Sequence, residues 1–269
     1  MLRIVERIAS RRNPLVLRYR AAAAGDDPAL LLDGAHLVQD ALSAGVAIRS
    51  AIVADAAIER DEYRHLAHRL REAGTDVVLA SDSVMSAVSP VRSPSAIVAL
   101  ADPPPRQPGA PYRVEIPLVL IACGVQDPGN LGAIVRVAEA AGASGVVAAG
   151  AGADPFSWKA LRGSMGSALR LPVTRQSAVG EAVEEARGHG CRIAATTPRS
   201  GTSLFEADLT GPLAVLLGGE GSGLDARTVE AADARLSIPM QPPVESLNAA
   251  VAAALLAYEA RRQRQPLGT

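Results

Sequence analysis

A proline-rich segment sets the organisation of this chain. Five prolines and one glycine fall within the ten residues 102–111. Proline locks the backbone φ angle and has no N–H to donate, so this run favours an extended, stiff connector. We therefore predict two domains, residues 1–102 and residues 112–269, joined by a linker over residues 103–111.

Both regions alternate short apolar runs with helical patterns. In the first region, strands are predicted at residues 29–32, 48–54, 77–80 and 97–100, and helices at 35–44 and 59–73. In the second, strands are predicted at 117–122, 145–149, 192–195, 213–217 and 236–238, and helices at 131–141, 178–188 and 246–262. This order predicts an α/β fold whose second domain has a largely parallel sheet. Ligands of such sheets bind at the carboxyl ends of the strands.

Composition narrows the class of protein. The longest apolar runs, residues 116–123 and 213–217, are far shorter than the roughly 18 residues that a membrane-spanning helix needs. Arg3, Glu6 and Arg7 interrupt the apolar residues at the start, which argues against a secretory signal. We therefore expect a cytoplasmic protein that does not enter a membrane. The net charge of −1 attracts no nucleic acid by itself, so any RNA contact must come from local patches.

Metal binding has little support in the sequence. Cys123 and Cys191 have no second cysteine or histidine at metal-ligand spacing, and two cysteines cannot form a disulfide framework. Asp61, His65 and His68 share one face of a predicted helix, but no fourth ligand accompanies them. A solvated helix face is the simpler interpretation, and we expect no metal site.

The first segment with chemical interest is 127–136, DPGNLGAIVR, which follows an apolar strand and opens a helix. Its proline and glycine favour a tight turn, and Asn130 can cap the helix. We expect Arg136 to project from the first helical turn. The helix dipole disfavours a positive charge there, so Arg136 requires an anionic partner. An ordinary strand-to-helix turn with a solvated arginine is the alternative.

The second segment is 216–224, LLGGEGSGL, at the end of another predicted strand. Its four glycines would let the backbone approach a ligand closely, and Glu220 places one carboxylate in the loop. No Gly-Lys-Ser or Gly-Lys-Thr follows, so this is not a phosphate-binding loop of the Walker type. A flexible glycine-rich turn is the alternative.

The third segment is 238–248, IPMQPPVESLN, which leads into the last predicted helix. Ser246 is a candidate N-cap of that helix. Apolar residues recur at helical spacing from this point: Leu247, Val251, Leu255 and Tyr258. Such a row is most simply core or subunit interface. Neither explains the polar pair Ser246 and Asn248.

Together the three segments resemble the SpoU, or TrmH-like, branch of the SPOUT methyltransferases. That branch carries an Asn-x-Gly-x-x-x-Arg turn, a Gly-x-Glu-Gly loop, and an Ile-Pro-Met segment ending in Ser-Leu-Asn, in this order. The resemblance covers residues 118–262. The first region resembles the substrate-binding module related to ribosomal protein L30e, through Asn13, Pro14 and residues 31–36. One departure is Pro243, where the family commonly has glycine.

The resemblance implies an L30e-like α/β domain followed by a parallel-sheet SPOUT domain tied in a deep trefoil knot, an exception to the rule against threaded chains. It implies S-adenosylmethionine as the cofactor and a homodimer formed through the last helix. The cofactor-binding residues by resemblance are Leu217, Gly218, Gly219, Ile238, Met240 and Leu247.

The activity implied by the resemblance is methylation of a ribose 2′-hydroxyl in RNA. The expected catalytic residues are Arg136, Asn130, Glu220, Ser246 and Asn248. Arg136 would activate the hydroxyl, either as an unusual base or by holding the adjacent phosphate. A guanidinium stays protonated in proteins and forks onto phosphate, which favours the second role.

RNA is therefore the expected partner, with 23S ribosomal RNA first and transfer RNA second, because the separate N-terminal module resembles large-subunit rRNA enzymes. Arginines that are candidates for phosphate contacts are Arg11, Arg12, Arg18, Arg20 and Arg162. Each of them alone also fits a solvated surface charge.

Rival functions are weaker. A dinucleotide fingerprint begins at Gly150 and Gly152, but Pro155 stands where its third glycine belongs. No Gly-x-Ser-x-Gly or His-Glu-x-x-His motif supports a hydrolase. A catalytically silent RNA-binding scaffold remains the main alternative. Such a scaffold would be marked by loss of the arginine or the cofactor loop, and this chain retains both.

Overall fold

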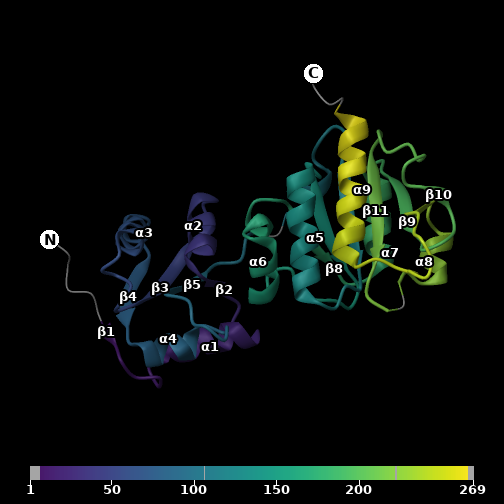
Figure 1. The fold of residues 1–269 in the computed structure, drawn as a ribbon. Coiled ribbons are helices and arrows are strands. Elements are labelled where there is room, and N and C mark those ends of the chain that lie inside the picture. Colours follow the sequence, from purple (N-terminus) through teal and green to yellow (C-terminus); the bar gives the residue numbers. More distant parts are fainter. Residues whose placement is uncertain (1–6, 106, 222, 266–269) are drawn as a thin grey trace. The chain divides into compact units, whose positions relative to one another are not determined.

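The computed structural model describes residues 7–105, 107–221 and 223–265. The chain forms two compact units (Figure 1). The first comprises Met1–Pro105 together with Phe156–Leu169, and the second comprises Arg106–Pro155 and Arg170–Thr269. A segment from the middle of the chain joins the first unit, whereas the linker predicted a single division of the chain at residues 103–111.

The first unit is built on a five-stranded sheet in the order β1-β4-β3-β5-β2. Strands β1, β4 and β3 are parallel, whereas β5 runs antiparallel to both β3 and β2. The strands are β1 (Arg7–Ile8), β2 (Leu30–Asp33), β3 (Ile48–Ala54), β4 (Asp76–Ala80) and β5 (Ile97–Ala101). All four strands predicted in this region are confirmed, because their runs of Val, Ile and Leu are buried on both faces.

Helices cover both faces of this sheet. Figure 1 shows α2 (Ala35–Ser43) and α3 (Asp61–Glu72) on one side, and α1 (Pro14–Ala24) and α4 (Asp82–Val88) on the other. The prediction located α2 and α3 but missed α1 and α4. Helix α1 buries only Val16 and Tyr19, and α4 has seven residues, so neither shows a clear apolar period.

The segment Phe156–Leu169 completes the first unit, although we predicted residues 112–269 as one continuous domain. Its helix α6 (Trp158–Ser164) packs beside β2. Nη1 of Arg162 lies 2.7 Å from Oδ2 of Asp33, whose side chain is fully buried. Oδ1 of the same carboxylate accepts a hydrogen bond of 2.8 Å from Ser89. A buried carboxylate is costly without such partners, so Arg162 has a structural role in this unit.

The second unit is built on a seven-stranded parallel sheet in the order β10-β12-β9-β11-β6-β7-β8. The strands are β6 (Leu118–Cys123), β7 (Gly145–Ala149), β8 (Val173–Gln176), β9 (Arg192–Thr196), β10 (Thr202–Ser203), β11 (Leu213–Gly218) and β12 (Ala234–Ser237). The five predicted strands and the predicted parallel α/β sheet are confirmed. Strand β8 was missed because this edge strand is polar and only partly buried, and β10 has two residues.

The helices of the second unit include α5 (Pro128–Ala141), α7 (Val179–Gly188), α8 (Ala226–Glu230) and α9 (Ala249–Arg264). Helices α5 and α9 lie side by side (Figure 1). The side of α9 that is buried is rich in alanine, so its backbone can approach its neighbours closely. Helix α5 buries Ile134, Ala138 and Ala141.

The second half of the linker packs against the second unit. The N–H of Gly109 donates to Oε1 of Glu185 at 3.1 Å, and Ala110–Tyr112 form a 3-10 turn. The buried ring of Tyr112 stacks on His189 with the ring centroids 4.8 Å apart. The stiff connector that we predicted over residues 103–111 therefore ends in an anchored turn.

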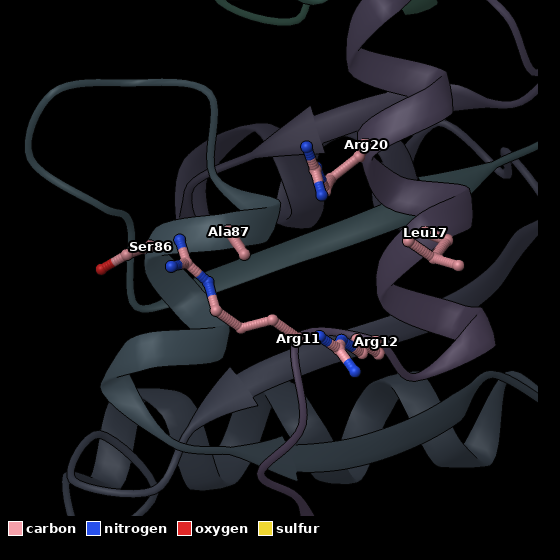
Figure 2. Close-up of a pocket in the computed structure, with 6 residues that line it drawn as sticks. All are labelled: Arg11, Arg12, Leu17, Arg20, Ser86 and Ala87. Atoms are coloured by element: carbon pink, nitrogen blue, oxygen red, sulfur yellow. The ribbon is translucent and has the colours of Figure 1, made fainter.

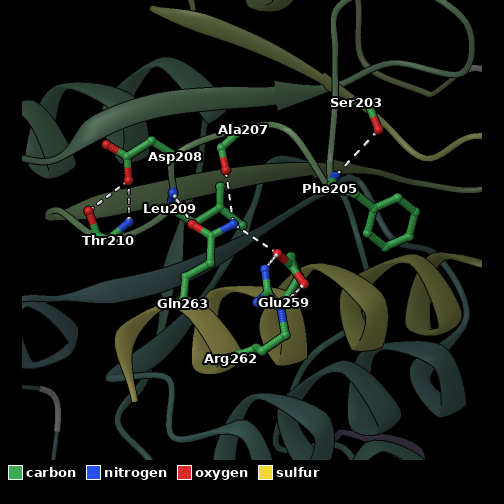
Figure 3. Close-up of polar contacts among 9 residues, drawn as sticks. All are labelled: Ser203, Phe205, Ala207, Asp208, Leu209, Thr210, Glu259, Arg262 and Gln263. Atoms are coloured by element: carbon green, nitrogen blue, oxygen red, sulfur yellow. Dashed lines mark hydrogen bonds and ion pairs between the residues drawn. The ribbon is translucent and has the colours of Figure 1, made fainter. Parts of the chain in front are cut away.

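An ion pair between the buried Glu259 and the exposed Arg262 lies in the last helix (Figure 3). The carboxylate of Glu259 accepts hydrogen bonds from Nε and Nη2 of Arg262, at 2.9 and 2.7 Å, and from Nε2 of Gln263 at 2.8 Å. Gln263 also donates to the carbonyl of Ala207 and accepts from the N–H of Leu209, which ties this loop to α9. The hydrogen bonds from Arg262 and Gln263 lower the pKa of Glu259 to about 2.

Glu259 should make the stability of the protein depend on acid pH. Its folded pKa of about 2 lies below the usual carboxyl value of 4.5. Its contribution is therefore complete above pH 4.5 and is lost as the pH falls toward 2. We expect Glu259→Gln to lower the free energy of unfolding by ~1 kcal/mol at neutral pH, with a difference that shrinks in acid. Urea unfolding of both proteins across this pH range measures it, and a difference independent of pH would contradict the assignment.

Candidate active site

The three motif segments follow strands of the second sheet. Residues 124–127 connect β6 to α5, residues 219–225 follow β11, and residues 238–248 connect β12 to α9. Strands β6 and β11 are parallel neighbours, and Cys123 at the end of β6 is paired with Gly218 at the end of β11. Because carboxyl ends of parallel strands lie at one edge of the sheet, the first two loops are adjacent there.

A hydrogen-bond network joins the three segments. Nδ2 of Asn130 donates to Oε1 of Glu220 at 2.6 Å, and Nδ2 of Asn248 donates to Oδ1 of Asn130 at 3.0 Å. The second carboxylate oxygen of Glu220 accepts from the backbone N–H of Gln126 at 3.2 Å. A carboxylate only accepts, so Asn130 must present its NH2 group to Glu220 and its carbonyl to Asn248. We call these three side chains, Asn130, Glu220 and Asn248, the amide–carboxylate network.

Glu220 is ionised in this network. Partial burial acts to raise the pKa of Glu220, but the hydrogen bonds from Asn130 and from backbone groups outweigh it and lower the pKa below its usual value of 4.5. The loops therefore enclose one negative charge held by amide donors. Because nothing in the network is a base of neutral pKa, its role is to orient groups rather than to accept a proton.

The start of α5 differs from the prediction. Asp127 is the N-cap, and its carboxylate accepts from the N–H of Asn130 at 2.8 Å, with Pro128 in the first turn. Asn130 is therefore not the cap, which leaves its side chain available to Glu220. The prediction for Arg136 was also wrong, because a helix that begins at Pro128 puts it in the third turn rather than the first.

Arg136 lies apart from the network within one chain. It stands six residues after Asn130 on α5, which is about 9 Å along the helix axis and on a different face. Its side chain is exposed, and no carboxylate among the residues that the structure describes forms an ion pair with it. An unneutralised guanidinium is available to an anion from outside the chain.

The start of α9 also differs from the prediction. Asn248, not Ser246, is the N-cap, and its Oδ1 accepts from the N–H groups of Ala250 and Val251. Asn248 thus uses its carbonyl for the helix and its NH2 for Asn130. Ser246 is exposed and lies outside the helix, and no hydrogen bond joins it to another described residue.

The residues predicted to bind a cofactor lie in the second and third motif segments. Leu217 is buried in β11, and Gly218 and Gly219 begin the loop after it. Ile238 and Met240 are half-buried, and Leu247 is exposed. The backbone groups of Ile238, Met240 and Leu247 make no hydrogen bond to other residues in the described ranges, so they can serve a ligand.

Two glycines of the second loop are required by close packing. A Cβ atom added to Gly219 would collide with the carbonyl oxygen of Gly124, and one added to Gly218 would lie 2.6 Å from the backbone of Gly223. Gly223 itself adopts a φ angle of +65°. The loop is therefore packed against the segment after β6, which argues against the alternative of a flexible glycine-rich turn.

Gln126 and Asp127 belong to the site, and the sequence reasoning missed both. The side chain of Gln126 donates to the carbonyls of Gly124 and Ala151, and so connects the loops after β6 and β7. An aspartate directly before a Pro at the first helical position is a recognisable cap signal, so Asp127 could have been found. Nothing in the sequence distinguishes Gln126 from a solvated residue.

The glycines that resembled a dinucleotide fingerprint and the polar face with Asp61 and His68 have structural explanations. Gly152 packs against the segment after β6, where an added Cβ would lie 2.7 Å from the carbonyl oxygen of Val125. Nδ1 of His68 lies 3.2 Å from Glu72, and Asp61 pairs with Arg64. No group of metal-ligating residues gathers in the described ranges.

Of the five arginines predicted to bind RNA, two have intramolecular partners. Arg18 lies 3.3 Å from Asp27, and Arg162 pairs with Asp33 as described above. The other three, all in the first unit, line one hollow, here called the basic hollow (Figure 2): Arg11, Arg12 and Arg20. No helix within the described ranges is both long and apolar enough to span a membrane.

Comparisons with known proteins agree with this geometry. A model of the SpoU rRNA methylase family matches residues 117–258. A 23S rRNA (guanosine(2553)-2′-O)-methyltransferase of Bacillus subtilis strain 168 is 34% identical over 231 residues, which cover 86% of this chain and 88% of that protein.

Two solved structures are similar over nearly the whole chain. An AdoMet-bound rRNA methyltransferase from Sinorhizobium meliloti has a TM-score of 0.84 and 28% identity, covering 96% of this chain and 98% of that one. The SpoU methyltransferase AviRb from Streptomyces viridochromogenes, in complex with AdoMet, has a TM-score of 0.85 and 29% identity, covering 94% and 98%.

Asn248 has two separable roles, and substitution can test them. Asn248→Ala removes both the cap of α9 and the donor to Asn130, so we expect it to lower the free energy of unfolding by ~1–2 kcal/mol. Asn248→Ser keeps a capping oxygen but cannot reach Asn130, so its stability should stay within about 0.5 kcal/mol of the parent protein. Urea unfolding measures both, and equal destabilisation by the two variants would show that Asn248 is not the cap.

Proposed function

This chain belongs to the SpoU rRNA methylase family, and on that premise we propose that it transfers a methyl group from S-adenosylmethionine to a ribose 2′-hydroxyl of 23S ribosomal RNA. The relative from Bacillus subtilis is named for this reaction on a guanosine. The observation that carries the proposal is the amide–carboxylate network, which ties all three motif segments of the family into one place. We also propose that the protein acts in the cytoplasm, which a ribosomal RNA substrate supports.

The residues present fit the proposed cofactor. S-adenosylmethionine has an apolar adenine face with polar edges and a charged amino-acid end. Ile238, Met240 and Leu247 combine apolar side chains with unpaired backbone groups, which suit adenine and its edges. Glu220 and its amide partners fix the loop opposite them. When bound, the cofactor supplies an electrophilic methyl group on a sulfonium.

Arg136 has the role of binding RNA phosphate. The 2′-hydroxyl is a weak acid, and a guanidinium that stays protonated does not remove its proton readily. A forked contact to the adjacent phosphate holds the ribose in line with the methyl donor and stabilises negative charge developing on its oxygen. As the new O–C bond forms and the S–C bond breaks, S-adenosylhomocysteine leaves and the hydroxyl proton passes to water. The exposed and unneutralised state of Arg136 supports this role. Asn130, Glu220, Ser246 and Asn248 act by orientation, and the trefoil knot implied for residues 218–248 remains a prediction.

The exposed face of α9 supports a homodimer. Three large apolar side chains of this helix are between 38% and 50% exposed: Val251, Leu255 and Tyr258. They lie at helical spacing on one face, which favours an interface over the core as the reason for the row. The resemblance to the family implies a dimer through this helix, so we propose a second copy of this chain as the occupant. Helix α9 packs against α5, which carries Arg136.

Arg136 should be essential for methyl transfer but not for cofactor binding. We expect Arg136→Ala to lower kcat by about 1,000-fold or more, because it removes the group that holds the reacting ribose. Arg136→Lys keeps the positive charge but cannot make a forked contact, so its kcat should lie between those of the parent protein and Arg136→Ala. Transfer of a labelled methyl group to protein-free 23S rRNA measures the rate, and ribose-methylation mapping of the product gives the nucleotide.

Controls distinguish loss of the Arg136 contact from misfolding, and an enzyme from a catalytically silent scaffold. Calorimetry with S-adenosylmethionine should give the same Kd for Arg136→Ala as for the parent protein. Arg69→Ala, in the exposed part of α3, should leave both rate and Kd unchanged. Full turnover by Arg136→Ala would refute the assignment. Failure of the parent protein to bind S-adenosylmethionine would refute the enzyme and favour an RNA-binding scaffold.

A charged substitution in the apolar row of α9 tests the proposed dimer interface. Leu255→Glu puts a carboxylate in the middle of the apolar row, and burying it in an interface is costly, so this variant should be monomeric. His65→Glu, on the exposed face of α3, is the matched control and should keep the parental mass. Sedimentation equilibrium measures both masses, and a parent protein that is itself monomeric at micromolar concentration would contradict the proposal.

A further inference from the structure

Arg199 lies outside the three motif segments but contacts one of them. It stands in residues 197–201, the loop between β9 and β10. Its Nη2 lies 2.5 Å from Oε1 of Glu245, which directly precedes Ser246 in the third motif segment. Neither side chain belongs to the amide–carboxylate network. Their ion pair therefore ties a fourth loop to the candidate active site.

The sheet brings this loop to the third motif segment. Strand β12 lies between β9 and β10 and is parallel to both, with Leu236 paired to Thr196 on one side and to Thr202 on the other. The loop from β9 to β10 therefore crosses β12 at the level of Leu236, close to where the third motif segment leaves the strand. A Cβ atom added to Gly201 would collide with the carbonyl oxygen of Arg235, so the loop packs directly on β12.

The loop that carries Arg199 is held at both ends. The N–H of Thr197 donates to the carbonyl of Leu236 at 2.8 Å, and the hydroxyl of Thr197 donates to the carbonyl of Ser200. Just after the loop, the N–H of Leu204 donates to the carbonyl of Ser237 at 2.8 Å. The guanidinium of Arg199 thus projects from a turn that is fixed to the sheet.

The third motif segment, in contrast, is weakly held along residues 241–248. Every one of these residues is exposed. The N–H of Val244 donates to the carbonyl of Gln241 at 3.1 Å, which is a bond inside the stretch. Within the described ranges, no hydrogen bond except that from Arg199 joins residues 241–247 to another part of the chain. The stretch is therefore fastened by β12 before it, by Asn248 at its end, and by one ion pair between them.

The ion pair is suited to reversible opening. The side chains of Arg199 and Glu245 are 72% and 75% exposed. Solvent and dissolved ions screen such a pair, so it adds little to stability and opens readily. The residues proposed to bind the cofactor, Met240 and Leu247, flank the stretch that the pair restrains. Its opening would let both of them move away from a ligand.

We propose that Arg199 is a positioning residue that holds residues 241–248 closed over S-adenosylmethionine, and that opening of the Arg199–Glu245 ion pair lets the cofactor enter and its product leave. The inference rests on the proposed function for the identity of the cofactor. Arg199 acts through Glu245 and does not contact the reacting atoms. Its contribution is to the residence time of the cofactor rather than to the chemical step.

Dissociation of the cofactor tests the proposal. Labelled S-adenosylmethionine bound to the protein is chased with excess unlabelled compound at low salt. We expect Arg199→Gln to speed dissociation and raise the Kd by about 2- to 5-fold, the range expected for an exposed ion pair. Added salt should speed dissociation from the parent protein, because ions screen the pair, but should have little effect on Arg199→Gln. An Arg199→Gln variant with the parental rate at low salt would overturn the proposal.

Exchange of the two charges separates the ion pair from a general effect on folding. Arg199→Glu should weaken cofactor binding at least as much as Arg199→Gln, because it places two carboxylates together. Adding Glu245→Arg to this variant restores opposite charges, so its Kd should return to within about 2-fold of the parental value. Arg64→Glu, which breaks the exposed ion pair with Asp61 on α3, is the matched control and should keep the parental Kd. A double variant no better than Arg199→Glu would contradict the assignment.

Proteolysis without cofactor distinguishes failure of this inference from failure of the proposed function. A glutamate-specific protease should cleave after Glu245 several-fold faster in Arg199→Gln than in the parent protein, with the fragment identified by mass. A parent protein that binds S-adenosylmethionine, together with parental dissociation and cleavage rates in Arg199→Gln, would overturn the inference alone. A parent protein that does not bind S-adenosylmethionine would refute the proposed function. Faster cleavage of Arg199→Gln would then still support the restraint by Arg199, and equal cleavage would overturn it as well.

Discussion

The hydrogen bond between Asn130 and Glu220 is the interaction on which the candidate site depends. It joins two loops that are 90 residues apart in sequence, and Asn248 adds a third that is 118 residues from Asn130. The bond exists because the parallel sheet puts β6 and β11 side by side and because Asp127 caps α5. With the cap position filled by Asp127, the Asn130 amide is free to bind the carboxylate. The charge of Glu220 in turn fixes the orientation of both amides.

Ion pairing separates the arginines into two groups. Arg162 neutralises the buried carboxylate of Asp33, and Arg262 does the same for Glu259. Buried carboxylates need such partners, so these arginines hold the fold together. Arg136 and the three arginines of the basic hollow are exposed and have no carboxylate partner among the described residues. The side chains that remain available to phosphate are thus those that the fold itself does not require.

Helix boundaries mark the limit of what could be predicted. The buried strands of both sheets were predicted to within about two residues, because runs of buried Val, Ile and Leu are a direct signal, whereas the short or polar strands β1, β8 and β10 were missed. The caps were not. Asn130, Ser246 and Asn248 are all residue types that cap helices, and only the course of the backbone determines which of them does so. The prediction put the cap of α5 at Asn130 and the cap of α9 at Ser246, whereas the caps are Asp127 and Asn248. It also missed Gln126.

The sequence by itself determined the α/β class, the parallel second sheet, and a family whose motifs name Arg136, Asn130, Glu220 and Asn248 as one group. These features are encoded in apolar period and in short motifs, which are local. Only the tertiary structure decided that Phe156–Leu169 joins the first unit, that Asn248 serves both α9 and Asn130, and that three of the five candidate arginines share one hollow. Those outcomes depend on contacts between residues far apart in the chain. Such contacts form because buried charges and backbone polar groups need hydrogen-bond or ion-pair partners. A pattern along the sequence does not record which residues will supply them.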